Sequence, residues 1–156
     1  MPNSTPATDP GSVVQVRYIV RDVDAAIRFY CRHLGFREVM HPAPTFAMLS
    51  RGPLRLVLSQ PSPAAGGGQS MPDGTTQTPG GWNRFAVDVT DLTATVASLR
   101  SSGVRLRNEI VVGVGGKQVI VEDPSGNPVE LFEPTLDEAR FRSKPSASAT
   151  DGSTDV

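Results

Sequence analysis

The chain has 156 residues, a formal net charge of −1 and a sequence pI of about 6.1. A charge balance this close to zero gives no general electrostatic attraction to nucleic acid or to an anionic membrane. The length suits one domain, or two small halves that share a core.

Three further features predict a soluble, cytoplasmic protein. The single cysteine, Cys31, has no partner for an internal disulfide, which favours a reducing compartment. The first residues, MPNSTPATDPGS, lack the charged and then apolar pattern of a secretory leader. No apolar run approaches the roughly 20 residues that a membrane-spanning helix needs. We therefore expect neither a membrane nor a nucleic-acid partner.

Both ends of the chain are predicted to be disordered. Residues 1–12 and 140–156 are rich in Ser, Thr, Pro and Asp and carry too few apolar side chains to offset the entropy of ordering. The sequence thus predicts an N-terminal tail over 1–12, an ordered domain over 13–134 and a mostly disordered C-terminal tail over 135–156.

Residues 13–59 have the pattern of a strand, a helix and three more strands. Apolar residues alternate from Val14 to Val20, which is typical of a strand with one buried face. Asp22 is placed to cap the N-terminus of a helix, and Gly35 fits the left-handed conformation just past a helix end. The helix would bury a stripe of apolar residues: Val23, Ile27, Tyr30 and Leu34. The later strands are expected at 36–41, 45–50 and 54–59.

A long stretch rich in Gly and Pro follows, QPSPAAGGGQSMPDGTTQTPGG, residues 60–81. It is too long for an ordinary connection between two strands, and such stretches are typical of linkers or of lids over a site. We interpret it as a linker, with a lid as the alternative.

Residues 82–134 repeat the pattern of the first half. WNRFAVDVTDLTATVASLRSSGV aligns with VQVRYIVRDVDAAIRFYCRHLGF, so that Asp91 corresponds to Asp22 and Gly103 to Gly35. The second helix would bury Leu92, Val96 and Leu99. Its later strands are expected at 104–112, 117–122 and 128–133, with Gly113, Gly115 and Gly116 as hairpin-turn residues. The chain is therefore predicted to be α+β, with two tandem βαβββ modules, 13–59 and 82–134.

Two motifs carry a resemblance to a known superfamily. They are RDVDAAIRFYCRHLGF, in the first module, and EDPSGNPVELFEP, at the end of the second. With both motifs at this separation, the chain resembles the vicinal oxygen chelate superfamily, which includes glyoxalase I, bleomycin-resistance proteins and extradiol dioxygenases. The resemblance implies two βαβββ modules whose curled, mixed sheets form a cup that holds the ligand.

In metal-binding members of this superfamily, the first and last strands of two modules supply the ligands. The resemblance places Gln15 and Arg55 at these positions in the first module, and Arg84 and Glu130 in the second. Strand alternation puts all four on the face away from the helices. Gln15 and Glu130 are the expected ligands if a metal is present. A guanidinium group, in contrast, has no lone pair to offer and stays protonated in proteins.

We therefore expect no metal or other cofactor, and we expect Glu130 to face arginine. Arg55 and Arg84 should lie near Glu130, with Arg17 and Asp88 on the same concave side. Two interpretations remain open. The charges could form a self-satisfied ion network, or a spare guanidinium could bind an anionic ligand. A divalent metal held by Gln15 and Glu130 is the alternative.

Two aromatic residues are further candidates for the ligand site. Trp82 follows the stretch 60–81 directly and would either stack over a ligand or fill a gap between the modules. Phe132 shares the strand face of Glu130 and is predicted to line the cup. His33 and His41 fit surface or rim positions, and Cys31 fits a thiol with no chemical role.

Three functions are consistent with these residues. The first is a metal-free homodimer that binds a small anionic or neutral metabolite in an arginine-lined cup. The second is a glyoxalase-type lyase, isomerase or dioxygenase in which Glu130 is catalytic. It would act with a metal, or without one if Arg55 or Arg84 stabilises an enolate. The third is a regulatory or scaffold domain without a small ligand.

Overall fold

The computed structural model describes residues 13–64 and 66–137. The predicted tails 1–12 and 135–156 lie outside the described residues, apart from positions 135–137. Within the described residues, neither helix has the length and apolar character to cross a bilayer.

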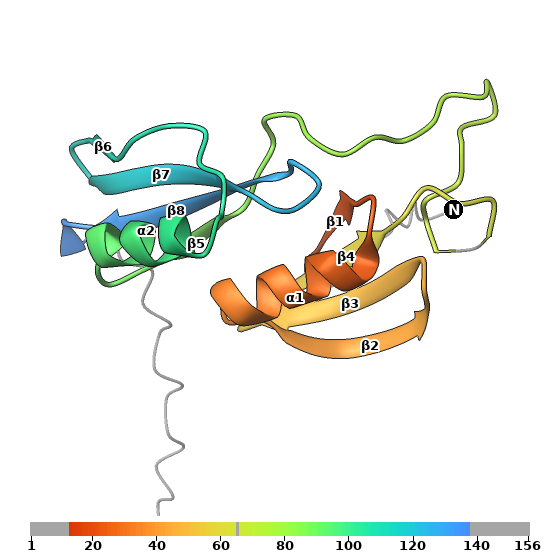
Figure 1. Cartoon of the computed structure of the whole chain (residues 1–156), viewed down its shortest axis with the longest axis horizontal. Helices are drawn as coiled ribbons and strands as arrows, with labels where there is room; N and C mark the ends of the chain where they lie inside the picture. Colours follow the sequence, from red (N-terminus) through yellow and green to blue (C-terminus); the bar gives the residue numbers. More distant parts are fainter. Residues whose placement is uncertain (1–12, 65, 138–156) are drawn as a thin grey trace, which may run out of the picture.

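The first module is a four-stranded sheet with one helix across one face (Figure 1). Strand β1 is parallel to β4, and the other neighbours are antiparallel, in the order β1-β4-β3-β2. The elements are β1 (Gln15–Ile19), α1 (Val23–His33), β2 (Arg37–Ala43), β3 (Phe46–Arg51) and β4 (Leu54–Ser59).

The second module repeats this connectivity, with β5 parallel to β8 and the order β5-β8-β7-β6. Its elements are β5 (Ala86–Asp88), α2 (Leu92–Ser101), β6 (Val111–Val112), β7 (Gly116–Glu122) and β8 (Pro128–Pro134). The predicted fold class is confirmed: the chain is α+β, with two βαβββ modules that each form a mixed four-stranded sheet.

The ends of both helices follow from the residues that the sequence places there. The Asp22 side chain accepts a hydrogen bond from the Ala25 backbone N–H, and Asp91 accepts one from Ala94, both at 2.9 Å. Each contact satisfies a helix N–H that has no partner within the helix. Gly35 and Gly103 have φ angles of 68° and 78°, which an L side chain rarely adopts.

The residues that the two helices bury are close to those predicted from the sequence. Helix α2 buries the three apolar residues that the sequence indicates, whereas α1 buries a wider face and leaves Ile27 only partly buried. The buried residues of α1 are Val23, Ala26, Phe29 and Tyr30, with Leu34 just beyond its end.

The prediction of a strand over 104–112 is wrong in its extent. Only Val111–Val112 forms a strand, and Leu106 makes an isolated bridge to Val121. The reason is that a side chain, and not the backbone, accepts one of the hydrogen bonds of this ladder. Asn108 Oδ1 accepts the Ile120 N–H at 2.8 Å, a bond that a continuous ladder would give to a backbone carbonyl. The ladder therefore breaks at Asn108.

Aromatic side chains join the two modules into one core. The Phe85 ring of the second module lies 5.3 Å from the Tyr18 ring, 6.4 Å from Tyr30 and 5.9 Å from Phe36, measured between ring centroids. Tilted and edge-to-face pairs at these distances add to the free energy of burial. Tyr30 is fully buried at this junction.

A single turn, residues 123–127, makes most of the polar contacts between the modules. Tyr30 donates to Asp123 Oδ2 at 2.9 Å, and Asn127 Nδ2 donates to the Ile19 carbonyl at 2.8 Å. The Arg21 backbone N–H donates to Ser125 Oγ at 2.8 Å. We call residues 123–127 the clasp, because they bind the region where β1 leads into α1.

The clasp is organised around the Asp123 carboxylate, which is 4% exposed. Besides Tyr30, it accepts hydrogen bonds from the Ser125 and Asn127 backbone N–H groups and from Asn127 Nδ2, at 2.8 to 2.9 Å. A buried carboxylate is stable only when its oxygens are satisfied in this way.

The two tyrosines at the junction resist ionisation in the folded protein. Burial raises the pKa of Tyr18 to about 12, and burial together with Asp123 raises the pKa of Tyr30 well above its usual value of 10.0. Because both folded-state pKa values exceed the unfolded ones, the two neutral tyrosines stabilise the folded state. This contribution to the free energy of unfolding is fully present below pH 10. It declines as the pH rises toward 12.

Tyr18 and Tyr30 are the only tyrosines of the chain, so ultraviolet absorbance reports on this pair alone. We expect no tyrosinate signal from the native protein at pH 10, where free tyrosine is half ionised, and we expect ionisation to coincide with loss of the native circular dichroism spectrum. Tyrosinate that appears near pH 10 in a still folded protein would contradict this burial.

Candidate functional site

The predicted site residues lie on the sheet faces away from the helices. In the first sheet Gln15 stands opposite Arg55, and in the second Ala86 stands opposite Glu130. Neighbours in register point to the same side of a sheet. The first sheet therefore presents Gln15, Arg17, Phe46, Met48 and Arg55 on this face, and the second presents Asp88, Gln118, Ile120, Glu130 and Phe132.

Glu130 lies against Arg84. The Nε and Nη2 atoms of Arg84 each lie 2.8 Å from Glu130 Oε2, while Nη1 donates to the Trp82 carbonyl at 3.2 Å. The two side chains are 29% and 18% exposed, so the pair is largely shielded from solvent. Both contacts use the same carboxylate oxygen, and no described residue donates a hydrogen bond to Oε1.

Arg55 does not join Glu130, which corrects the predicted cluster. Its Nη1 atom donates to the carbonyls of Gly52 and Leu54, at 3.1 and 3.3 Å. Among the described residues it forms no ion pair. The reason lies in the strand pairing: β4 places Arg55 beside Gln15 in the first sheet, whereas Glu130 belongs to the second sheet.

Arg17 holds part of the stretch 60–81 against the first sheet. Its Nη1 atom donates to Ser59 Oγ and to the Gly66 carbonyl, and Ser59 Oγ donates to the same carbonyl at 2.6 Å. Gly67 lies so close to the Arg17 guanidinium that a Cβ there would be 2.1 Å from Nη1. This part of the stretch therefore packs on the non-helix face as well as connecting the modules.

Gln15 and Asp88, the remaining polar candidates, are both exposed. Asp88 lines a hollow of about 290 Å³ with Val89, Thr90, Glu133 and Pro134. Neither Gln15 nor Asp88 contacts Glu130 directly in the described part of the chain. The structure therefore divides the predicted site residues between two sheets and joins only Arg84 to Glu130.

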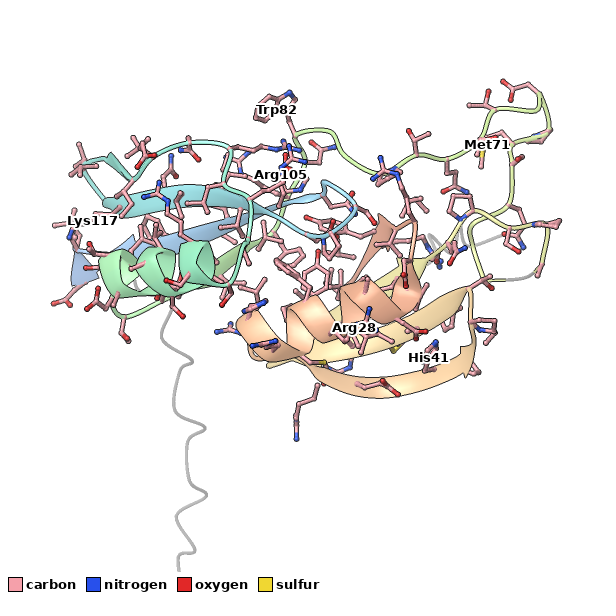
Figure 2. The ribbon with its side chains drawn as sticks, in the orientation of Figure 1. Arg28, His41, Met71, Trp82, Arg105 and Lys117 are labelled. Carbon is pink, nitrogen blue, oxygen red and sulfur yellow. The ribbon has the colours of Figure 1, made fainter. Side chains whose placement is uncertain are left out.

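The aromatic candidates lie in different surroundings. Trp82 is 70% exposed, and the Arg107 guanidinium carbon lies 4.7 Å from the centroid of its ring, in cation–π geometry. Trp82 stands at the upper edge of the molecule in Figure 2. Phe132 is half-buried, and the tip of its ring lies close to the backbone of Gly116.

The side chains at the four family positions do not suit a divalent metal. Gln15 and Glu130 offer oxygen atoms, but Arg55 and Arg84 offer only N–H donors, and Arg84 already occupies one oxygen of Glu130. Within residues 13–64 and 66–137, the structure places no three His, Cys, Asp or Glu side chains where they could share an ion. Burial and Glu38 raise the pKa of the Cys31 thiol, which disfavours its nucleophilic form.

The sequence analysis did not identify one further cluster. A pocket of about 430 Å³ lies between α1 and the second module, lined in part by Arg28, Arg32 and Arg105. The only signal in the sequence was the spacing of two arginines four residues apart on one helix.

Comparisons with proteins of known structure show the same fold. A lactoylglutathione lyase from Agrobacterium tumefaciens is 21% identical, with a TM-score of 0.60 over 81% of this chain and 96% of that one. The antibiotic-binding protein TnmS3 from Streptomyces sp. CB03234 is 22% identical, with a TM-score of 0.61 over 83% of this chain and 100% of that one.

A superfamily member from Sphaerobacter thermophilus is 24% identical, with a TM-score of 0.61 over 79% of this chain and 97% of that one. No curated protein matches the sequence. The model of the Glyoxalase/Bleomycin resistance protein/Dioxygenase superfamily matches residues 12–131, which cover the first module and all but the last three residues of the second. The chain therefore belongs to the glyoxalase/bleomycin resistance protein/dioxygenase superfamily.

Proposed function

We propose that this protein binds a small anionic or neutral molecule on the non-helix face of its sheets, without a metal. The candidate ligand-binding residues are those of the sequence prediction: Gln15, Arg17, Arg55, Trp82, Arg84, Asp88 and Phe132, with Glu130 as the candidate catalytic residue. The proposal includes a cytoplasmic location, which the free thiol of Cys31 favours.

The observation that carries this proposal is the contact between Arg84 and Glu130. A cation seated on Glu130 would have to displace this guanidinium or lie beside it, and like charges at such short range repel strongly. Arg17 and Arg55, in contrast, contact only hydroxyl and carbonyl oxygens among the described residues. A planar guanidinium without a carboxylate partner is suited to bind a carboxylate or phosphate.

Elemental analysis tests the metal-free part of the proposal. Protein purified without chelator should contain far less than one equivalent of zinc, nickel, manganese or iron per chain. A near-stoichiometric content of any of these metals, lost on substitution Glu130→Gln, would contradict it.

Calorimetric titration with small carboxylates and inorganic phosphate tests the anion site. We expect Arg55→Gln to weaken binding by about tenfold, because a hydrogen bond to a charged group contributes about 1.5 to 3 kcal/mol and exposure reduces that value. Arg51→Gln is the matched control, since Arg51 pairs with Leu54 and so points to the opposite side of the sheet from Arg55. Equal affinities of both variants would place the anion elsewhere.

One observation favours an enzyme as the second candidate. Glu130 Oε1 accepts no hydrogen bond from the described residues and is therefore available to accept a proton. A metal-independent lyase or isomerase would use Glu130 to remove a proton from a carbon next to a carbonyl, while Arg84 stabilises the enolate.

Deuterium incorporation tests this second candidate. A 2-oxo acid incubated with the protein in D₂O should gain deuterium at that carbon faster than in buffer alone. Glu130→Gln should abolish the gain, and Glu109→Gln, a change at an exposed carboxylate paired with Arg100, should preserve it. Exchange at the buffer rate would exclude this activity for the acid tested.

We also propose that two chains pair. Apolar side chains are exposed on one edge strand of each sheet: Val39 and Met40 on β2, and Val111 and Val112 on β6. Exposed apolar edges of this kind are typical of interaction surfaces. Analytical ultracentrifugation should show a dimer, and Val112→Glu should shift the equilibrium to monomer. A monomer at all concentrations would contradict the pairing.

A further inference from the structure

The pocket between α1 and the second module lies on the helix side of the first sheet, away from the face discussed above. Its volume of about 430 Å³ is in the range of small-molecule sites. The lining residues are Ala25, Arg28, Phe29, Arg32, His33, Ser102, Gly103, Val104, Arg105, Glu122, Asp123 and Pro124.

One face of α1 forms the first wall. Its five lining residues follow the spacing i, i+3, i+4, i+7 and i+8, so their side chains lie along one side of the helix. The C-terminal end of α1 points toward the second module (Figure 1), and Arg28 projects from this helix (Figure 2). This face is therefore exposed to the space between the modules.

Two cationic side chains on this wall have no carboxylate partner. Arg28 and Arg32 are four residues apart, so their charges repel rather than stabilise the helix. Neither forms an ion pair or a side-chain hydrogen bond with a described residue. Asp24, which has the right spacing to pair with Arg28, instead lies 3.8 Å from the His41 imidazole.

Both carboxylates that line the pocket already have hydrogen-bond or ion-pair partners within the protein. Glu122 Oε1 accepts from Arg107 at 2.9 Å, and Oε2 lies 3.5 Å from Arg105. Asp123 is the centre of the clasp and accepts from Tyr30 and from its own turn. The positive charge that the pocket presents to a ligand therefore comes from Arg28 and Arg32.

The pocket also has an apolar part. Phe29 is 6% exposed and lies at the level of both arginines on α1, with its ring centroid 5.6 Å from that of His33. Val104 and Pro124 line the opposite wall. An inorganic ion would leave this apolar surface in contact with water, whereas a ligand with an apolar body would cover it.

We propose that this pocket binds a small organic anion. Its phosphate or carboxylate lies against Arg28 and Arg32, and its apolar body lies between Phe29 and Val104. Two guanidinium groups on adjacent turns of a helix can each donate two hydrogen bonds to one such group. The bound anion also removes the repulsion between the two arginines.

Proton NMR of the histidine rings tests the proposal with phenyl phosphate as the probe. The chain has only two histidines; His33 lines the pocket, and His41 lies on β2. We expect phenyl phosphate to shift the His33 resonances in a saturable way and to leave those of His41 nearly unchanged. Inorganic phosphate and phenol, which each lack one half of the probe, should bind at least about tenfold more weakly.

A pair of variants separates this pocket from the opposite sheet face. Arg28→Gln combined with Arg32→Gln should weaken the phenyl phosphate response of His33 by at least about tenfold, with an unchanged unfolding temperature because both side chains are exposed. Arg55→Gln should leave this response unaltered. The proposal is overturned if His33 does not respond, or if Arg55→Gln abolishes the response and the double variant preserves it.

Discussion

Replacing Asp123 by alanine should lower the free energy of unfolding by about 3 to 5 kcal/mol, because each buried donor left without an acceptor costs about 1 to 3 kcal/mol. The side chain is 4% exposed and accepts four hydrogen bonds, from Tyr30, the Ser125 N–H, and the backbone and side chain of Asn127. Urea denaturation followed by circular dichroism measures the loss.

Two further variants control for the size of this effect. Tyr30→Phe removes one of the four bonds and should cost about 1 kcal/mol. Asp73→Ala removes an exposed carboxylate that also accepts a turn N–H, from Thr75, and should leave the denaturation midpoint unchanged. If Asp123→Ala were no more destabilising than Tyr30→Phe, the clasp would not be the main polar connection between the modules.

Replacing Gly116 by alanine should cost about 3 kcal/mol, the upper part of the range for an overpacked site. A Cβ at this position would lie 2.2 Å from the Glu133 carbonyl oxygen and 2.8 Å from Phe132 Cζ. The backbone of β8 would have to move. Because the Glu133 carboxylate accepts the Leu92 N–H at the start of α2, a shift of β8 also disturbs the helix.

Gly113 provides a matched control at the other end of the same turn. Its N–H donates to the Gly116 carbonyl at 2.8 Å, yet a Cβ on Gly113 would meet only that oxygen, at an ordinary 3.7 Å. Gly113→Ala should therefore unfold at nearly the same urea concentration as the parent protein. Equal losses for both substitutions would indicate that backbone flexibility, and not the contact with Glu133, explains the preference for glycine.

The fold could be predicted because it depends on local patterns that repeat. Asp22 and Asp91 begin the helices, Gly35 and Gly103 end them, and the alternation of apolar residues marks the strands. The strand predicted at 104–112 was wrong because a side chain there accepts a hydrogen bond that a backbone carbonyl would otherwise accept. At Asn108 the amide oxygen takes a ladder hydrogen bond, and nothing in the alternation of neighbouring residues indicates this.

The candidate site could be predicted only in part, because contacts between sheets depend on register and on how the modules meet. Alternation places Arg55 and Glu130 on the non-helix faces, but it does not say which residues of the neighbouring strands lie beside each of them. Arg84 lies just before β5, the neighbour of β8, and so it reaches Glu130. The pocket beside α1 depends on the docking of the second module, which no local pattern describes.

The clasp also makes the two modules unequal. The connection between β7 and β8 has five residues, 123–127, whereas β3 and β4 are joined only by Gly52 and Pro53. The hydrogen bonds of the clasp therefore run from the second module to the first, and the two-residue turn between β3 and β4 is too short to return them. The attachment of one half to the other thus depends on a loop that belongs to one half alone.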